Sequence, residues 1–278
     1  MNIPAAVIIG GGILLLVGAG ALWNASDTAS RLDASAGRTE TNLPIPPLPP
    51  RVADGAQYDR CLAQVSDDPQ RAATEALAWR DTGGGASATH CLAIAQLALG
   101  QAEPAARLLQ ALASDHTAAA PVRAAMFSQA SQAWQMAGRP DDALASAKAA
   151  VGLVSDNPDL WIDLANTAMA RKDYPAAIDG LTRALALDRS RADILVLRAA
   201  ANRLGGRLDP ALNDVDRAIA ADPDNAEALL ERGVLRQRRD DPEGARADWL
   251  RVLALAPESQ AADLATQDIA LLDAGPVR

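Results

Sequence analysis

The chain has 278 residues, a formal net charge of −9 and a pI of about 4.7. This acidic balance argues against nucleic-acid binding, which depends on clustered cations that displace counterions from phosphates. Hydrophobic residues make up 49% of the sequence but aromatic residues only 3%. Alanine supplies most of the excess, so closely packed helices suit this composition better than a bulky globular core.

The first feature along the chain is an uninterrupted run of 18 apolar or glycine residues, Ala5–Leu22, followed by Trp23. Such a run is just long enough to cross a membrane, and the aromatic residue stands where an interfacial anchor is expected. We therefore predict a transmembrane anchor or signal segment over residues 1–25. A cleavable signal peptide is the alternative to an uncleaved anchor, because Ala19–Ala21 fits a small-x-small cleavage site, although the first four residues carry no Lys or Arg. A buried helix of the domain is the third possibility.

A proline-rich linker is predicted over residues 26–52. Five prolines fall within residues 43–50, a density that excludes helix and favours an extended polyproline conformation. We interpret this stretch as a stiff spacer between the first segment and the rest of the chain. A ligand for an aromatic-lined groove is the alternative.

The remaining chain, residues 53–278, has the pattern of stacked helical hairpins. Residues 53–123 are predicted as degenerate hairpins, the first of them shortened and broken at Ser66–Pro69, and residues 124–157 as a further repeat. The extra residues around Asp115–Pro121 predict either a loop or an extended helix start.

Three units at residues 158–191, 192–225 and 226–259 repeat nearly the same pattern at an offset of 34 residues. Their fourth, eighth, twentieth and twenty-fourth positions hold, unit by unit, Trp161, Leu195 and Leu229; Ala165, Ala199 and Gly233; Ala177, Ala211 and Ala245; and Leu181, Val215 and Trp249. The spacing predicts helix, turn and helix, with the turn at Gly206 or Asp240. A fixed period in this range is typical of a solenoid, and these positions resemble the tetratricopeptide repeat, a 34-residue helical hairpin.

The resemblance implies an all-α helical-hairpin solenoid, here preceded by the one N-terminal transmembrane or signal helix. A helix over 260–274 is expected to cap the last repeat. In the resembling family, the first helix of each hairpin lines a concave face that mostly binds other proteins. The implied contact positions hold, in the three units, Asp159, Ile162, Asn166 and Met169; Asp193, Val196, Ala200 and Arg203; and Glu227, Leu230, Val234 and Gln237.

The implied face lacks the clamp of the chaperone-binding members, which hold a carboxyl terminus with lysine at the fifth and asparagine at the ninth position. Asn166 matches the ninth position, but the fifth is Ile162, Val196 or Leu230. We predict instead an aliphatic strip with acidic residues along one edge, suited to a helix or extended segment with apolar anchors. Alternatively, some of these aliphatic side chains pack against neighbouring helices.

Two arginines occupy the seventh position of the unit, which is normally apolar. Arg198 and Arg232 are each followed sixteen residues later by an aspartate, Asp214 and Asp248, on the second helix of the same hairpin. The repeated spacing predicts an ion pair within each hairpin, so these arginines are expected to be structural.

The chain has two cysteines, Cys61 and Cys91, each followed by Leu-Ala on the predicted first helix of adjacent hairpins. Equivalent helices pack at roughly 8–10 Å, which brings facing cysteines within reach of a disulfide. Such a bond persists only in an oxidising compartment. The alternative is a pair of small buried thiols.

Little catalytic or metal-binding chemistry is available. His90 stands beside Cys91, but a zinc site needs four well-spaced ligands, and His116 has no such neighbours. Many aspartates fall at helix starts, where capping explains them. We expect no enzyme activity, no cofactor and no metal.

The sequence therefore predicts a scaffold that binds a protein or peptide partner, not nucleic acid, and meets the membrane through its N-terminal segment. A self-assembling structural subunit and a regulatory domain for a separate enzyme are the alternatives. Arg31 and Arg38, after the apolar run, favour a cytoplasmic domain, whereas a disulfide favours an extracytoplasmic one. We predict a membrane-anchored extracytoplasmic (periplasmic) domain, with export after signal cleavage or a cytoplasmic-facing domain as alternatives.

Overall fold

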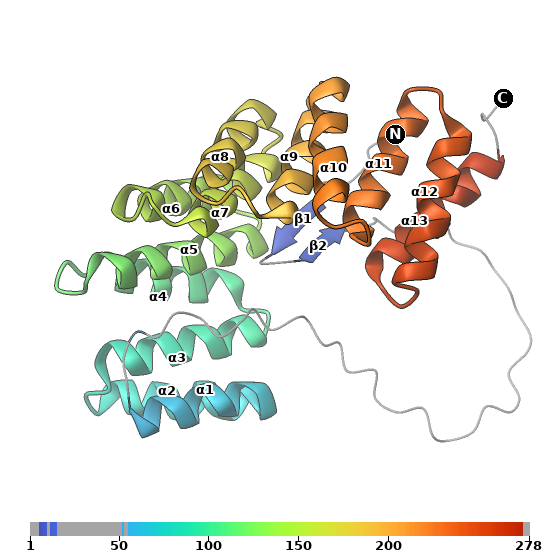
Figure 1. Ribbon diagram of the computed structural model, residues 1–278. Helices are drawn as coiled ribbons and strands as arrows, with labels where there is room; N and C mark the ends of the chain where they lie inside the picture. Colours follow the sequence, from blue (N-terminus) through green and yellow to red (C-terminus); the bar gives the residue numbers. More distant parts are fainter. Residues whose placement is uncertain (1–5, 10–11, 16–51, 53–54, 275–278) are drawn as a thin grey trace, which may run out of the picture.

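The computed structural model describes residues 6–9, 12–15, 52 and 55–274. From residue 56 to residue 274 these described residues form thirteen consecutive α-helices, arranged as a curved stack of antiparallel hairpins (Figure 1). The expectation of an all-α solenoid is confirmed for this part of the chain.

Each hairpin consists of a first and a second helix. The first helices are α1 (Ala56–Asp67), α3 (Gly85–Ala98), α5 (Ala120–Met136), α7 (Pro158–Ala170), α9 (Ala192–Leu204) and α11 (Ala226–Arg238). The second helices are α2 (Pro69–Asp81), α4 (Ala102–Ala113), α6 (Pro140–Leu153), α8 (Tyr174–Leu187), α10 (Leu208–Ala221) and α12 (Pro242–Leu255). First helices of neighbouring hairpins also contact one another, as α5 does α7 and α9 does α11. The last helix, α13 (Gln260–Ala274), packs against α11 and α12 in the position expected of a cap.

The helix boundaries follow from local chemistry. Asp68 caps α2 by accepting a hydrogen bond from the Arg71 amide at 3.0 Å, and Pro69 occupies the first turn, where its missing N–H costs nothing. The turns after α9 and α11 use the left-handed region, at Gly206 (φ 77°) and Asp240 (φ 63°). These are the two turn positions predicted from the repeat, and glycine adopts this conformation without steric cost.

Helix α5 shows how the extra residues before the third hairpin are used. It begins at Ala120, four residues before the start expected from the repeat at Ala124. Of the two alternatives, the extended helix start is the one observed. The Arg123 guanidinium ties this added turn to α4, since its Nε donates to the Ala113 carbonyl oxygen at 2.9 Å.

The core of the last repeat depends on a match between a small and a large residue. A Cβ atom added at Gly233 would lie 2.3 Å from Nε1 of Trp249, which is fully buried. The corresponding pairs in the two preceding units are Ala165 with Leu181 and Ala199 with Val215, all buried. The eighth position therefore shrinks to glycine in the unit whose twenty-fourth position holds tryptophan, which keeps the packing dense.

The described part of the N-terminal run differs from the predicted helix. Ala6–Ile9 (β1) and Gly12–Leu15 (β2) pair as antiparallel strands, with Ala6 opposite Leu15 and Ile9 opposite Gly12, and β1 lies against α7. The β-branched residues in these segments favour extended backbone. The rest of the predicted anchor or signal segment, and the linker apart from Val52, lie outside the described residues. Within the described ranges, no helix is both long enough and apolar enough to cross a bilayer.

Candidate partner-binding face

The predicted contact positions lie on the first helices of the last three hairpins, and we call this set of positions the first-helix face. Asp159, Asp193, Glu227 and Gln237 are exposed; Ile162, Met169, Ala200, Arg203, Leu230 and Val234 are half-buried; Asn166 and Val196 are buried. Asn166 and Val196 expose only 6% and 4% of their surfaces, so neighbouring side chains cover them and a partner could not contact them. The structure thus corrects the expectation that these two side chains are open to a partner.

The aliphatic residues of this face have a double role. Ile162 and Met169 pack against the core shared by α7, α8 and α9, while Leu230 and Val234 pack against the core around α11, α12 and α13. Part of each side chain therefore packs against neighbouring helices, as the alternative interpretation of the sequence predicted. The remaining part is open to solvent and forms the apolar strip of the face.

Carboxylates follow one edge of the first-helix face at the second position of each unit. Asp159 and Asp193 share one guanidinium, because Arg191 donates from Nη1 to Asp159 at 3.0 Å and from Nε and Nη2 to Asp193 at 2.9 and 2.7 Å. The hydrogen bonds from Arg191 lower the pKa of Asp193. Glu227 has no cation within ion-pair distance among the described residues.

Asp163 is a further carboxylate of this face that the sequence did not single out. It lies on α7, half-buried, and accepts hydrogen bonds from two α5 side chains, the Ser128 hydroxyl and the Gln132 amide, the latter at 3.4 Å. Burial raises the pKa of Asp163 to about 6, and the two hydrogen bonds partly oppose this shift. The sequence did contain one signal for Asp163. It occupies the sixth position of its 34-residue unit, and the third of these units also has an acidic residue there, Glu231.

Arg203 was predicted as a contact residue, but it is engaged within the fold. Its Nε and Nη2 donate to the two carboxylate oxygens of Glu231 at 2.6 and 3.0 Å, which joins α9 to α11. Burial raises the pKa of Glu231, while the positive charge of Arg203 opposes the shift. This pair holds neighbouring first helices in register and leaves no net charge.

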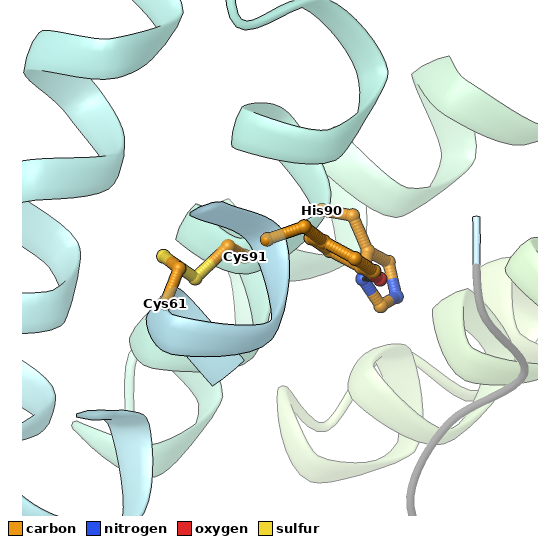
Figure 2. Close-up of a disulfide and its surroundings, with 4 residues drawn as sticks. Cys61, His90 and Cys91 are labelled. Carbon is orange, nitrogen blue, oxygen red and sulfur yellow. Dashed lines mark hydrogen bonds between the residues drawn. A yellow bond between two sulfur atoms is a disulfide. The ribbon is translucent and has the colours of Figure 1, made fainter. Parts of the chain in front are cut away.

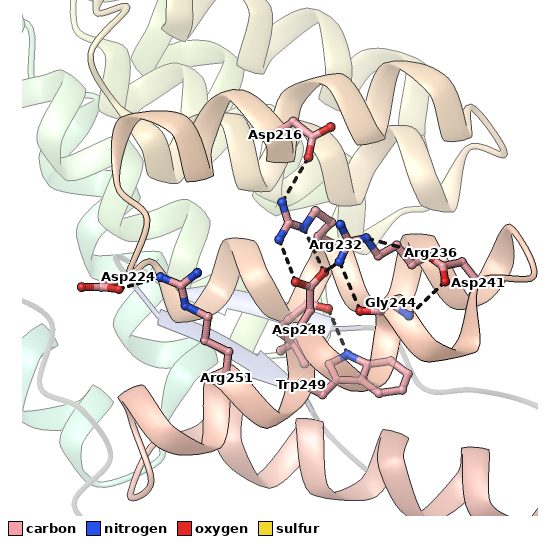
Figure 3. Close-up of polar contacts among 10 residues, drawn as sticks. Asp216, Asp224, Arg232, Arg236, Asp241, Gly244, Asp248, Trp249 and Arg251 are labelled. Carbon is pink, nitrogen blue, oxygen red and sulfur yellow. Dashed lines mark hydrogen bonds and ion pairs between the residues drawn. The ribbon is translucent and has the colours of Figure 1, made fainter.

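The predicted ion pairs lie on the other side of the first helices, facing their own second helices. Arg198 donates from Nε and Nη2 to Asp214 at 2.8 and 2.7 Å. Figure 3 shows the equivalent pair of the next unit, in which Arg232 donates from Nε and Nη2 to Asp248 at 2.9 and 2.7 Å. Arg236 adds a third donor to Asp248 at 2.7 Å. These arginines link first to second helix within a hairpin, and their donors are directed at carboxylates of the fold.

At the N-terminal end, the structure joins Cys61 of α1 to Cys91 of α3 by a disulfide, with a Cα–Cα distance of 6.2 Å (Figure 2). His90 continues this link. Its Nδ1 accepts from the Tyr58 hydroxyl at 2.6 Å and its Nε2 lies 2.8 Å from Oε1 of Gln129 on α5. Burial lowers the pKa of His90 to about 4, so the ring is neutral and serves as a hydrogen-bonded bridge between α1, α3 and α5.

A metal ion or a small molecule would require an arrangement of side chains of its own. Among the residues that the structure describes, no three His, Cys, Asp or Glu side chains are grouped to hold a metal. A cavity of about 320 Å³ opens beside Cys61, but Arg71 and Glu75 in its wall pair with each other at 2.7 Å.

Sequence comparison agrees with the hairpin geometry. Residues 135–201 and residues 205–262 each match a family model described as tetratricopeptide repeat. The chain contains tetratricopeptide repeats. Over 81 residues it is also 37% identical to the heat-shock protein cognate co-chaperone sgt12 of Aspergillus fumigatus. That match covers 29% of this chain and 24% of sgt12, so the chain spans about a quarter of this curated relative.

Solved tetratricopeptide repeat structures superpose on much of the solenoid. MamA 41-end from Desulfovibrio magneticus RS-1 has a TM-score of 0.54 at 19% identity, over 63% of this chain and 97% of that one. YrrB, whose structure is titled a TPR protein with an unusual peptide-binding site, has a TM-score of 0.50 at 18% identity, over 68% of this chain and 96% of that one. At these identities the likeness shows the shared fold alone.

The carboxylate of Asp163 makes a test of the electrostatics of this face. Its pKa in the folded chain, about 6, lies above the ordinary 3.8, so the folded state binds more protons than the unfolded state between these values. The contribution of Asp163 to the free energy of unfolding therefore falls as pH rises from about 4 to 7. We expect Asp163→Asn to raise the free energy of unfolding by roughly 1–2 kcal/mol at pH 8, allowing for its partial exposure, and by little at pH 4. Urea unfolding at both pH values measures this difference.

The matched control is Asp179→Asn, which removes an exposed carboxylate of α8 that pairs with Arg183 at 3.3 Å. It should change stability by a few tenths of a kcal/mol at either pH. Equal or lower stability of Asp163→Asn at pH 8 would show that this carboxylate is not destabilising.

Proposed function

We propose that this protein is a non-enzymatic scaffold that binds a segment of a partner protein on the first-helix face of its repeats. The observation that carries the proposal is the strip of half-buried aliphatic side chains, Ile162, Met169 and Leu230, bordered by exposed carboxylates on equivalent positions of successive repeats. Apolar anchors flanked by polar groups suit the docking of a helix or an extended segment. Fold likeness to a repeat protein titled as peptide-binding supports the same class of function.

The mode of recognition we propose differs from the carboxylate clamp. The fifth positions are Ile162, Val196 and Leu230, and none of them is a cation. The free carboxyl terminus of a ligand would therefore lack its usual basic partner and would meet carboxylates instead. A co-chaperone role like that named for sgt12 would require another way of holding its ligand.

We further propose that residues 1–25 anchor the repeat domain to a membrane, which requires the β1–β2 pairing and its contact with α7 to give way to a spanning helix, and that the domain functions outside the cytoplasm. The support is the apolar run Ala5–Leu22, together with the Cys61–Cys91 disulfide, since disulfides persist in oxidising compartments. Digestion of the repeat domain by protease added to cells whose outer envelope has been opened tests this location, and protection from that protease would contradict it.

The face is tested by charge insertion. We expect Ile162→Asp together with Leu230→Asp to abolish partner capture while helicity, measured by far-ultraviolet circular dichroism, stays unchanged. Each side chain is half-buried, so its open side would carry the new carboxylate into the apolar strip and oppose docking of an apolar anchor. Capture is measured by affinity purification from cells expressing the full chain.

Capture that survives in a folded double variant would contradict the proposal. If the double variant loses helicity, the milder pair Ile162→Gln and Leu230→Gln replaces it. The alternative of a self-assembling subunit makes a different prediction: the only polypeptide captured would be a second copy of this chain, and sedimentation of the purified protein would depend on concentration. Dependence of an enzyme's activity on the captured complex would favour the regulatory alternative.

A further inference from the structure

We propose that the segment bound on the first-helix face is cationic, with Lys or Arg side chains placed between its apolar anchors. This inference rests on the proposed function and specifies the chemistry of the partner. It follows from the charge that the fold leaves unbalanced on this face.

The carboxylates of the face outnumber its available cations. Asp159 and Asp193 are served by Arg191 alone, so the three side chains retain one negative charge. Glu227 has no ion-pair partner among the described residues. The guanidinium of Arg203 already pairs with the Glu231 carboxylate, through hydrogen bonds of 2.6 and 3.0 Å. Arg238 is exposed on α11 and its charge acts on the nearby Glu231, so one cation stands toward the C-terminal end of that helix. The unmatched charge at the second positions, held by Asp159, Asp193 and Glu227, is negative.

Asp163 adds a carboxylate that the fold keeps at a cost. It is half-buried, its protein partners are the neutral side chains of Ser128 and Gln132, and Asp159 stands one helical turn away. An ionised carboxylate can accept about four hydrogen bonds, so two donors leave acceptor capacity free. An incoming ammonium or guanidinium group would provide both the missing hydrogen bonds and the missing charge.

The spacing of these carboxylates fits one short helix. Asp163 lies on α7 and Glu227 on α11, and one other first helix, α9, stands between them in the stack. Packed helices lie roughly 8–10 Å apart from axis to axis, so the axes of α7 and α11 are roughly 16–20 Å apart. A helix rises 1.5 Å per residue, so about 11 to 14 residues span this distance. A cationic amphipathic segment of this length can therefore reach both ends of the strip.

The test uses three synthetic 14-residue peptides that carry leucines at the same helical spacing. All remaining positions are Lys in the first peptide, Gln in the second and Glu in the third. Binding to the full chain is measured by fluorescence anisotropy at low and high salt. We expect the Lys peptide to bind on the order of tenfold more tightly than the Gln peptide, the Glu peptide to bind more weakly than either, and the difference to shrink at high salt. Asp163→Asn with Glu227→Gln should remove most of the preference for Lys.

The matched control is Asp179→Asn with Glu243→Gln, which removes two exposed carboxylates from the second helices α8 and α12. This variant should retain the preference for the Lys peptide, because its two carboxylates lie off the first-helix face. It removes the same number of negative charges as the test variant and so controls for general attraction to an acidic protein. Equal loss in both variants would overturn the inference, as would equal binding of the Lys and Gln peptides. If the Gln peptide binds and Ile162→Asp with Leu230→Asp abolishes that binding, the face still binds apolar segments and only the cationic inference fails. Binding of every peptide unchanged by Ile162→Asp with Leu230→Asp would contradict the proposed function itself.

Discussion

Replacing Asp214 by alanine is expected to lower the free energy of unfolding by roughly 3 kcal/mol. The Asp214 side chain is 4% exposed and holds the guanidinium of Arg198, which is 18% exposed. Removing the aspartate leaves a largely buried cation without its partner, which typically costs 3–5 kcal/mol, and the residual exposure of Arg198 places this case at the lower end. Chemical denaturation of the purified chain measures the change.

The double replacement Arg198→Met with Asp214→Leu should cost much less than Asp214→Ala, because it removes both charges and fills the space with apolar side chains. As a further control, Asp179→Ala breaks an exposed pair with Arg183 and should change stability by no more than about 1 kcal/mol. If Asp214→Ala is no worse than the double replacement, the pair does not act as a buried structural unit.

Reduction of the Cys61–Cys91 disulfide is expected to destabilise the first hairpins by roughly 3–4 kcal/mol. The bond closes a loop with a sequence separation of 30 residues between α1 and α3, and the chain-entropy model assigns about this value to a loop of that size. The melting temperature of the purified chain, with and without a phosphine reductant, measures the effect.

The control is the variant Cys61→Ala with Cys91→Ala, which should melt at the reduced protein's temperature and not respond to the reductant. The hydrogen bonds of His90 to Tyr58 and Gln129 remain in that variant and should keep α1 and α3 helical. Alkylation of two free thiols in denatured, non-reduced protein from its native compartment would contradict the disulfide and remove its support for an exported domain.

The repeat could be predicted from sequence because its constraints are local and recur. The 34-residue offset places the same apolar positions in each unit, and the sixteen-residue interval from Arg198 to Asp214 is a distance between two helices of one hairpin. Side chains fixed by contacts inside one hairpin follow directly from that register. The turn residues Gly206 and Asp240 follow in the same way, from the conformation that the turn requires.

Contacts between hairpins were harder to predict because they depend on how one unit is rotated against the next. Asp163 is held by Ser128 and Gln132 of the preceding hairpin, and no interval within a unit indicates this. The same rotation buries Val196 and turns Arg203 toward Glu231. The exposed edge at Asp159, Asp193 and Glu227 remained predictable, because the second position of each unit stands at the start of its helix.

Site-specific photo-crosslinking in cells tests the binding face most directly. A photoreactive residue is introduced at Glu227, exposed on first helix α11, and separately at Leu250, which is 52% exposed on second helix α12. We expect the residue at Glu227 to crosslink to another polypeptide and the residue at Leu250 not to do so. The Glu227 adduct should be lost with Ile162→Asp and Leu230→Asp. Crosslinks from Leu250 alone, or from Glu227 only to a second copy of this chain, would contradict it.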